Sequence, residues 1–192
     1  MGVEVLPCYV VCDVSSSMGE HVDELNAGLR EFRGALHADP AAATLVRVCV
    51  IGFAAEPRVV QPLVTAADLA ELPGPAAEAG TNYGPAFALL RSTVEHDVRG
   101  LKGLRLRVRR PVVFFASDGR PTDRATWSAA FAAFADPDWA ARPTVVAYGL
   151  GAADHTTLGE IGTRGSYCHR GVRVGTALTS AVATTAARTD HI

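Results

Sequence analysis

The sequence predicts an α/β domain of the doubly wound, Rossmann-like class: a mostly parallel six-stranded sheet with helices on both faces. Short apolar runs typical of strands alternate along the chain with segments of helical periodicity. The chain has 192 residues, 48% of them hydrophobic and 20% charged, which is enough to build a substantial core. Because no internal repeat or low-complexity linker interrupts the pattern, we expect one domain over residues 1–192.

The expected strands are continuous apolar runs, which suit strands covered on both faces. They are residues 6–12, 45–53, 58–64, 112–116, 144–150 and a short run at 166–169. Prolines flank the run 58–64, so we expect it to be an edge strand that closes a hairpin with the strand before it. The expected strand order is therefore 3-2-1-4-5-6, with one antiparallel edge strand.

Apolar residues recur with helical spacing in four segments. These segments are 22–36, 87–98, 127–134 and 174–185. The first should end before Asp39 and Pro40, since proline does not continue a helix. Residues 72–80 are rich in proline, glycine and alanine and are expected to form a loop.

Composition excludes several classes of protein. The net charge of −2 gives no general attraction to nucleic acid or to a membrane surface. No apolar run approaches the roughly 20 residues that span a bilayer. The N-terminus has no basic segment before its apolar run, which favours a strand over a signal peptide and a cytoplasmic location. The four cysteines, Cys8, Cys12, Cys49 and Cys168, are expected to be small buried hydrophobic residues in a reducing compartment.

Two of the expected strands end in an aspartate. The run 6–12 leads into Asp13, and the run 112–116 leads into Asp118 by way of Ser117. These strands are neighbours in the expected order, at the point where it reverses and where such sheets bind ligands. Two adjacent carboxylates repel each other unless a cation or a proton lies between them.

Two serines extend this candidate site. Ser15 and Ser17 follow Asp13 at offsets of two and four, so a loop leaving the strand can aim both hydroxyls at one point. Hard oxygen ligands of this kind suit magnesium, manganese or calcium rather than zinc. A small, compact ligand set favours Mg²⁺ or Mn²⁺ over Ca²⁺.

The stretch Asp13-x-Ser15-x-Ser17 resembles the D-x-S-x-S motif that begins the metal-ion-dependent adhesion site (MIDAS) of von Willebrand factor A (VWA) domains. Thr81 matches the threonine of that family's second loop, and Asp118 matches the aspartate of its third loop. The strand and helix pattern that carries the resemblance covers residues 5–187. Residues 25–29 and 118–123 are most similar to the bacterial VWA proteins associated with tellurium resistance.

The resemblance implies a metal-dependent interaction module rather than an enzyme. The five side chains would hold Mg²⁺ or Mn²⁺, and an octahedral ion would keep a sixth position open. In the family, an Asp or Glu of the partner protein completes that shell. The resemblance further implies a bacterial stress-response role beside a protein phosphatase or a protein kinase, and we expect a monomer.

The chain departs from the family pattern at two positions. Ser16 stands where the family usually has glycine, so the loop must avoid a positive φ there or accept strain. Ser117 stands where the family usually has threonine. Neither departure removes an expected metal ligand.

Three alternatives remain open on the sequence. Asp13 and Asp118 could cap helices, although capping does not explain the serines and Thr81. The chain could be a magnesium-dependent phosphotransfer enzyme with Asp13 as nucleophile, although such phosphatases have a second acid where this chain has Ser15. It could also be a metal-free VWA scaffold that binds through its loops.

The segment 99–110 holds six basic residues and no acidic one. It is either a docking surface for an acidic partner or nucleic acid, or a solvated loop or edge segment before a strand. Its leucines alternate with arginines, as in an amphipathic strand. Thr122 and Asp123 are expected to cap the helix at 127–134, and Asn82 to form a turn.

Overall fold

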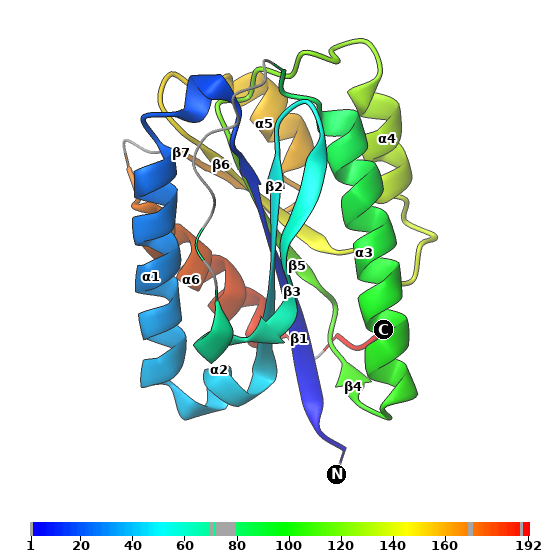
Figure 1. Ribbon diagram of the computed structural model, residues 1–192. Helices are drawn as coiled ribbons and strands as arrows, with labels where there is room; N and C mark the ends of the chain where they lie inside the picture. The colour runs from blue at the N-terminus through cyan, green and yellow to red at the C-terminus, as the bar shows by residue number, and fades with distance from the viewer. Residues whose placement is uncertain (1, 70, 72–79, 169–170, 189) are drawn as a thin grey trace.

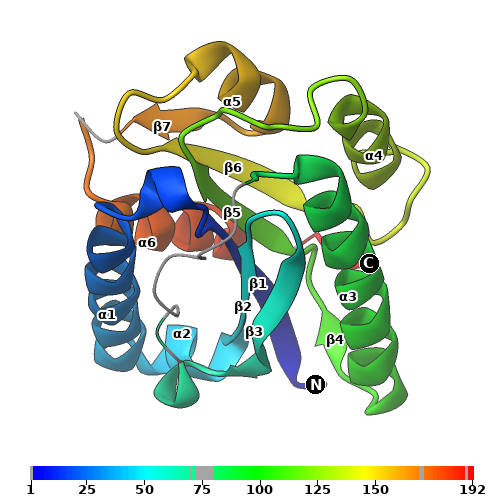
Figure 2. The same cartoon turned by 45° about the horizontal axis from the view of Figure 1, so that its top comes forward.

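The computed structural model describes residues 2–69, 71, 80–168, 171–188 and 190–192. Its centre is a seven-stranded sheet with helices on both faces (Figures 1 and 2). Most of the expected loop at 72–80 lies outside the described residues. None of the described helices has the length and the apolar composition that crossing a bilayer requires.

The sheet has the order β3-β2-β1-β5-β6-β7, and β4 pairs with β1 off this path. The strands are β1 (Glu4–Asp13), β2 (Val46–Phe53), β3 (Pro57–Thr65), β4 (Arg107–Val108), β5 (Val112–Ser117), β6 (Thr144–Gly149) and β7 (Ser166–Cys168). Among the strands of the described residues, only β3 runs antiparallel to its neighbour. The expected order and antiparallel edge strand are confirmed, and the two-residue β4 is an addition too short to be recognised in the sequence.

Four of the helices correspond to the expected ones. The helices are α1 (Val22–Ala38), α2 (Pro40–Leu45), α3 (Tyr83–Gly103), α4 (Trp127–Phe134), α5 (His155–Ile161) and α6 (Val174–Ala186), with 3-10 turns η1 (Ser16–Met18) and η2 (Ala66–Asp68). The prediction missed α2 and α5, which are too short for a helical repeat to show. Both have an aspartate N-cap, Asp39 and Asp154, whose carboxylates accept backbone N–H bonds.

The sheet is buried on both faces, as the continuous apolar strands predicted. Alternate residues of β1 point to opposite sides: Val10 packs with Phe32 of α1, whereas Val11 packs in the cluster that contains Phe87 of α3. Figure 2 shows α1 and α6 on one side of the sheet and α3 and α4 on the other. Because both clusters hold the central strands, the ends of β1 and β5 are fixed with respect to each other.

Three cysteines lie in this core, as expected. Cys8, Cys12 and Cys49 are buried and free. Burial raises the pKa of each thiol, that of Cys49 to about 12, so these thiols stay protonated and unreactive. The side chain of Cys168 lies outside the described residues.

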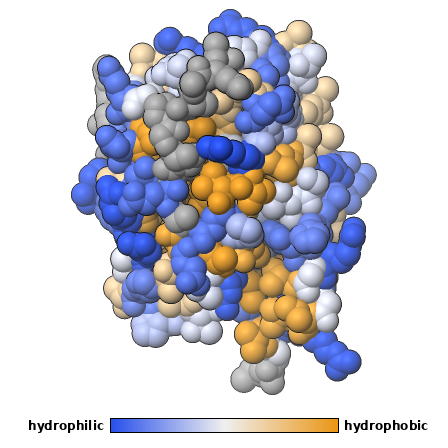
Figure 3. Space-filling view, viewed as in Figure 1, coloured by the Kyte–Doolittle hydropathy of each residue, from blue (hydrophilic) through white to orange (hydrophobic). Residues whose placement is uncertain are grey.

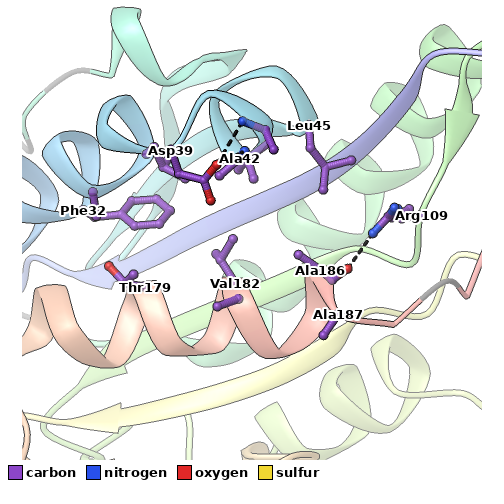
Figure 4. Close-up of a pocket in the computed structure, with 14 residues that line it drawn as sticks. Phe32, Asp39, Ala42, Leu45, Arg109, Thr179, Val182, Ala186 and Ala187 are labelled. Atoms are coloured by element: carbon purple, nitrogen blue, oxygen red, sulfur yellow. Dashed lines mark hydrogen bonds between the residues drawn. The ribbon is translucent and has the colours of Figure 1, made fainter.

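A pocket of about 440 Å³ lies between α1, α2 and α6 (Figure 4). Its lining is mainly apolar and includes Phe32, Leu45 and Val182. The carboxylate of Asp39 at its edge caps α2, and the guanidinium of Arg109 donates to a backbone carbonyl of α6. The pocket lies toward the C-terminal end of α1, whereas Asp13 precedes the N-terminal end, so it is no part of the candidate metal site.

The basic segment 99–110 is neither a simple loop nor an amphipathic strand. Its first five residues complete α3, and only Arg107–Val108 form a strand. Between them, Arg105 N–H donates to the Lys102 carbonyl and Leu106 N–H to the Leu101 carbonyl. This is the Schellman pattern of a helix end, and it places Arg105 at φ 59°, in the left-handed region that glycine usually occupies there.

Arg105→Gly is therefore expected to stabilise the fold by about 1 kcal/mol, because glycine adopts this φ without a steric penalty. Urea unfolding measures the change. Arg99→Gly, in the helical part of the same segment, is the matched control and should destabilise by about 1 kcal/mol. A lower urea midpoint for Arg105→Gly would contradict the argument.

Candidate metal site

The loop after β1 brings three of the predicted ligands together. Asp13 is fully buried, and its Oδ1 accepts the backbone N–H of Ser15 at 2.9 Å. The hydroxyls of buried Ser15 and exposed Ser17 lie 3.1 Å apart, so both are directed to one region as predicted. Ser16 does not have a positive φ, since Arg105 is the only described non-glycine residue that does. Serine is therefore accommodated in place of glycine without strain.

The loop after β5 lies against this first loop. Ser117 Oγ donates to Asp13 Oδ2 at 2.6 Å, and both groups are buried. Asp118 is partly exposed, and its Oδ1 accepts the backbone N–H of Arg120 at 3.0 Å. Neither aspartate is the N-cap of a described helix, so the capping alternative is wrong for these residues.

Burial is the main cause of the raised pKa of the Asp13 carboxyl. Desolvation raises the pKa of its carboxyl to about 6, against the hydrogen bonds from Ser117 and Ser15, which lower it. The nearby charge of Asp118 raises it slightly further. Asp13 forms no ion pair with any described residue, so no described side chain supplies the positive charge that would stabilise its ionised form.

The loop before α3 places the fourth predicted ligand, Thr81. Thr81 is buried, and it exchanges two hydrogen bonds with Thr122: its N–H donates to Thr122 Oγ1 at 3.0 Å, and its carbonyl accepts Thr122 N–H at 2.8 Å. Asn82 accepts from Thr122 Oγ1 and donates to the carbonyl of Ala55. Asn82 thus joins the second loop to the third loop and to the β2-β3 turn, which is more than the turn role expected for it.

Asp123 corrects the expectation that Thr122 and Asp123 cap α4. Its two carboxylate oxygens accept the backbone N–H groups of Tyr83 at 3.0 Å and Gly84 at 2.7 Å. These are donors of the first turn of α3, which have no partner within the helix. The N-cap of α4 is Thr126, which makes no side-chain cap. A contact between residues 40 apart leaves no signal in local sequence, which is why the nearer helix was predicted.

A buried hydrogen-bonded chain that the sequence did not reveal supports Asp13. The hydroxyl of Tyr83 lies 2.7 Å from Ser117 Oγ, which also donates to Asp13. Gly119 N–H donates to the same Ser117 oxygen at 3.2 Å. Ser117 thus links the first turn of α3 to the carboxylate at the end of β1, and burial raises the pKa of Tyr83 far above its usual range.

Tyr83→Phe is expected to destabilise the protein by about 1 kcal/mol, because it removes one hydrogen bond while Ser117 keeps its other partners. Ser117→Ala should cost more, about 2 kcal/mol, because it leaves Asp13 Oδ2 buried without a donor. Urea unfolding in the presence of a chelator measures both. Equal effects would show that the hydrogen bond from Ser117 to Asp13 contributes no more to stability than the one between Tyr83 and Ser117.

A positive φ and close neighbours favour glycine at two positions around the site. Gly119 has φ 74°, and a Cβ there would lie 2.6 Å from the carbonyl oxygen of Asp154. Gly151 has φ 59°, and a Cβ there would lie 2.7 Å from Nε2 of His21. The loops after β5 and β6 therefore pack tightly beside the first loop.

The three loops meet at the carboxyl ends of the parallel strands (Figure 2). Their side chains offer two carboxylates and three hydroxyls, a donor set that suits a hard divalent cation. Among the described residues, no three His, Cys, Asp or Glu side chains gather in a way that could hold a metal ion. Any metal at this place therefore depends on hydroxyl ligands, which is the set the sequence predicted.

Comparisons with known proteins support the fold. No family model matches the chain, and no curated protein sequence is significantly similar to it. Solved structures do match: the pilus adhesin SpaC from Lactobacillus rhamnosus GG has a TM-score of 0.72 at 15% identity, over 96% of this chain and 30% of SpaC. BatB from Bacteroides thetaiotaomicron has a TM-score of 0.62 at 16% identity, over 95% of this chain and 100% of BatB.

A third similar structure is proximal thread matrix protein 1 from the mussel byssus, in a form with a zinc-occupied MIDAS motif. Its TM-score is 0.62 at 17% identity, over 96% of this chain and 48% of that protein. The chain thus spans about half of the mussel protein and less than a third of SpaC, but all of BatB. A further match is the ArnB paralog VWA2 from Sulfolobus acidocaldarius. The chain has the VWA fold.

Proposed function

We propose that this chain is a metal-dependent protein interaction module. Asp13, Ser15, Ser17, Thr81 and Asp118 would hold Mg²⁺ or Mn²⁺, and an Asp or Glu of a partner protein would complete the coordination shell. The observation that carries the proposal is the carboxylate of Asp13, which is fully buried and has no cationic partner among the described side chains. A buried carboxylate is costly unless a cation offsets its charge.

The ligand set supports the choice of partner chemistry. The three hydroxyls are neutral, so only two carboxylates offset the charge of a divalent ion. An open position on such an ion attracts a further hard anionic oxygen, which a partner carboxylate supplies. The zinc-occupied MIDAS of the mussel protein, a protein of the same fold, supports a divalent ion at this place.

The wider role proposed here rests on the sequence resemblance alone. Residues 25–29 and 118–123 resemble the bacterial VWA proteins of tellurium resistance. We infer from them a cytoplasmic stress-response role, as a monomer beside a protein kinase or phosphatase. Such a partner would present its carboxylate at the end of the sheet where the three loops meet.

The phosphotransfer alternative fits the geometry less well. A nucleophilic aspartate must reach a phosphorus atom, whereas Asp13 is fully buried and both its oxygens accept hydrogen bonds. Hydrolysis of a generic phosphoester that is lost in Asp13→Ala would revive it. A metal-free scaffold is distinguished by the metal titration that follows.

The test is a titration of chelator-treated protein with Mn²⁺, in which electron paramagnetic resonance measures the free ion. Wild type should show one saturable site, and Ser15→Ala/Ser17→Ala should lose it. Ser16→Ala is the matched control, because Ser16 lies between the two proposed ligands and is exposed. Equal binding by wild type and the double variant would refute the assignment, and no saturable site in wild type would favour the metal-free scaffold.

A further inference from the structure

A second exposed surface lies at the end of α3 that is far from the metal site. Leu104 is 73% exposed and is one of three large hydrophobic residues that the described chain exposes. A second is Val3 at 58%, whose carbonyl accepts the N–H of Arg107, three residues after Leu104. Figure 3 shows hydrophobic surface gathered at the lower end of this face, with hydrophilic atoms at its edge.

Three basic residues lie within five positions of Leu104, at the end of α3. Arg99, Lys102 and Arg105 are exposed, and none of them forms an ion pair with a described residue. The nearby acids have other partners: Glu95 pairs with Arg91, Asp97 accepts the hydroxyl of Tyr9, and Glu4 binds Arg107, Arg109 and His191. The segment 99–110 therefore has a local positive charge in a chain whose net charge is −2.

The backbone of this turn is held in one conformation. The Schellman hydrogen bonds fix residues 104–106 to the last turn of α3, and the N–H of Arg107 pairs with β1. A non-glycine residue, Arg105, occupies the left-handed position. A rigid turn presents its side chains at a small entropic penalty on binding, which favours a docking role over a merely solvated loop.

We propose that Arg99, Lys102, Leu104 and Arg105, the basic turn, form a second docking surface that binds an acidic, leucine-containing segment of another protein. Helix α3 has 21 residues, so the basic turn lies about 30 Å from the metal site at the other end of the helix. One partner could engage both surfaces only if it spans that length.

The chemistry of the turn favours an acidic protein segment over other anionic partners. Arginine pairs with carboxylates through two parallel hydrogen bonds, and the exposed Leu104 offers an apolar contact beside them. No aromatic residue lies in 99–110, so the stacking that single-stranded nucleic acid requires is missing. The three cations of the basic turn are fewer than the four to eight of a typical lipid-binding basic cluster.

The test measures fluorescence polarisation of a labelled peptide in which glutamates alternate with leucines. The buffer contains chelator, so that the metal site cannot contribute. Wild type should bind the peptide saturably but not a version with glutamine in place of glutamate. Arg99→Gln/Lys102→Gln/Arg105→Gln should weaken binding about tenfold or more, since each exposed pair contributes a modest share.

Three further proteins complete the design. Leu104→Ser should weaken binding without a change of charge. Arg58→Gln removes an exposed arginine from β3, and Ser15→Ala/Ser17→Ala alters only the metal site, so both should bind as wild type does. No saturable peptide binding, equal loss in Arg58→Gln, or sedimentation with phosphatidylserine vesicles in place of peptide binding would overturn the proposal.

Discussion

Asp13→Asn is expected to abolish binding of Mn²⁺ and, at the same time, to stabilise the metal-free protein at pH 7. The substitution removes the negative charge but keeps the shape of the side chain. Asn Oδ1 can accept the N–H of Ser15, and Asn Nδ2 can donate to Ser117 Oγ, whose hydroxyl hydrogen is free to rotate. The loss of metal binding would therefore report the charge rather than a collapse of the loop.

The gain in stability follows from the burial of Asp13. A pKa raised from 3.8 to about 6 corresponds to about 3 kcal/mol against the folded, ionised form at pH 7. Because the pKa of Asp13 is higher in the folded than in the unfolded state, wild type becomes more stable as the pH falls from about 6 towards 4. Above pH 6, the ionised carboxylate lowers the stability of the folded state by its full amount. The asparagine variant lacks this dependence.

Urea unfolding in chelator at pH 7 and pH 4.5 measures the effect on stability, and the manganese titration measures binding. Asp118→Asn is the control, because Asp118 is partly exposed and should lose metal affinity with little gain in stability. A variant of Asp13 that is less stable than wild type at pH 7 would show that the ionised carboxylate stabilises the first loop by itself. The site would then need no cation.

The contrast between what the sequence predicted and what it missed has a physical basis. Strands such as Val46–Phe53 are buried on both faces, so their apolar runs are visible in the sequence, and a helix as long as α1 repeats its apolar spacing several times. The site loops were predicted from the ends of β1 and β5, because strand ends in such a sheet meet at one edge. Local pattern and topology were sufficient for these elements.

Contacts between distant segments were not predictable in the same way. Tyr83 lies before the helix expected at 87–98, and only the fold brings its hydroxyl to Ser117, 34 residues away. Asp123 reads as a cap of the helix that follows it, but the packing of α3 on α4 offers it unpaired N–H groups of α3. The predicted role of Asp123 was wrong because its carboxylate has a possible partner close in sequence and binds another one that only the fold brings near.

Asp123→Ala is expected to destabilise the protein by about 3 kcal/mol and to weaken Mn²⁺ binding about tenfold. Its carboxylate satisfies two backbone donors at the start of α3, and hydrogen bonds to a charged acceptor contribute about 1.5–3 kcal/mol each. Thr81 lies two residues before that helix and is tied to Thr122, the neighbour of Asp123. Loss of the Asp123 carboxylate should therefore weaken the positioning of Thr81, a proposed metal ligand, although Thr81 itself is unchanged.

Asp39→Ala separates this positional effect from a general loss of stability. Asp39 also caps a helix by accepting two backbone N–H groups, but α2 lies at the other end of the sheet. Its removal should cost about 1 kcal/mol and leave the affinity for Mn²⁺ unchanged. If both variants lowered the affinity for Mn²⁺ in proportion to their loss of stability, the hydrogen bonds from α3 to Asp123 would stabilise the fold but would have no separate role in positioning the metal site. A loss confined to Asp123→Ala would show that a contact between residues 40 apart in sequence sets the geometry of the second loop, and hence the strength of the metal site.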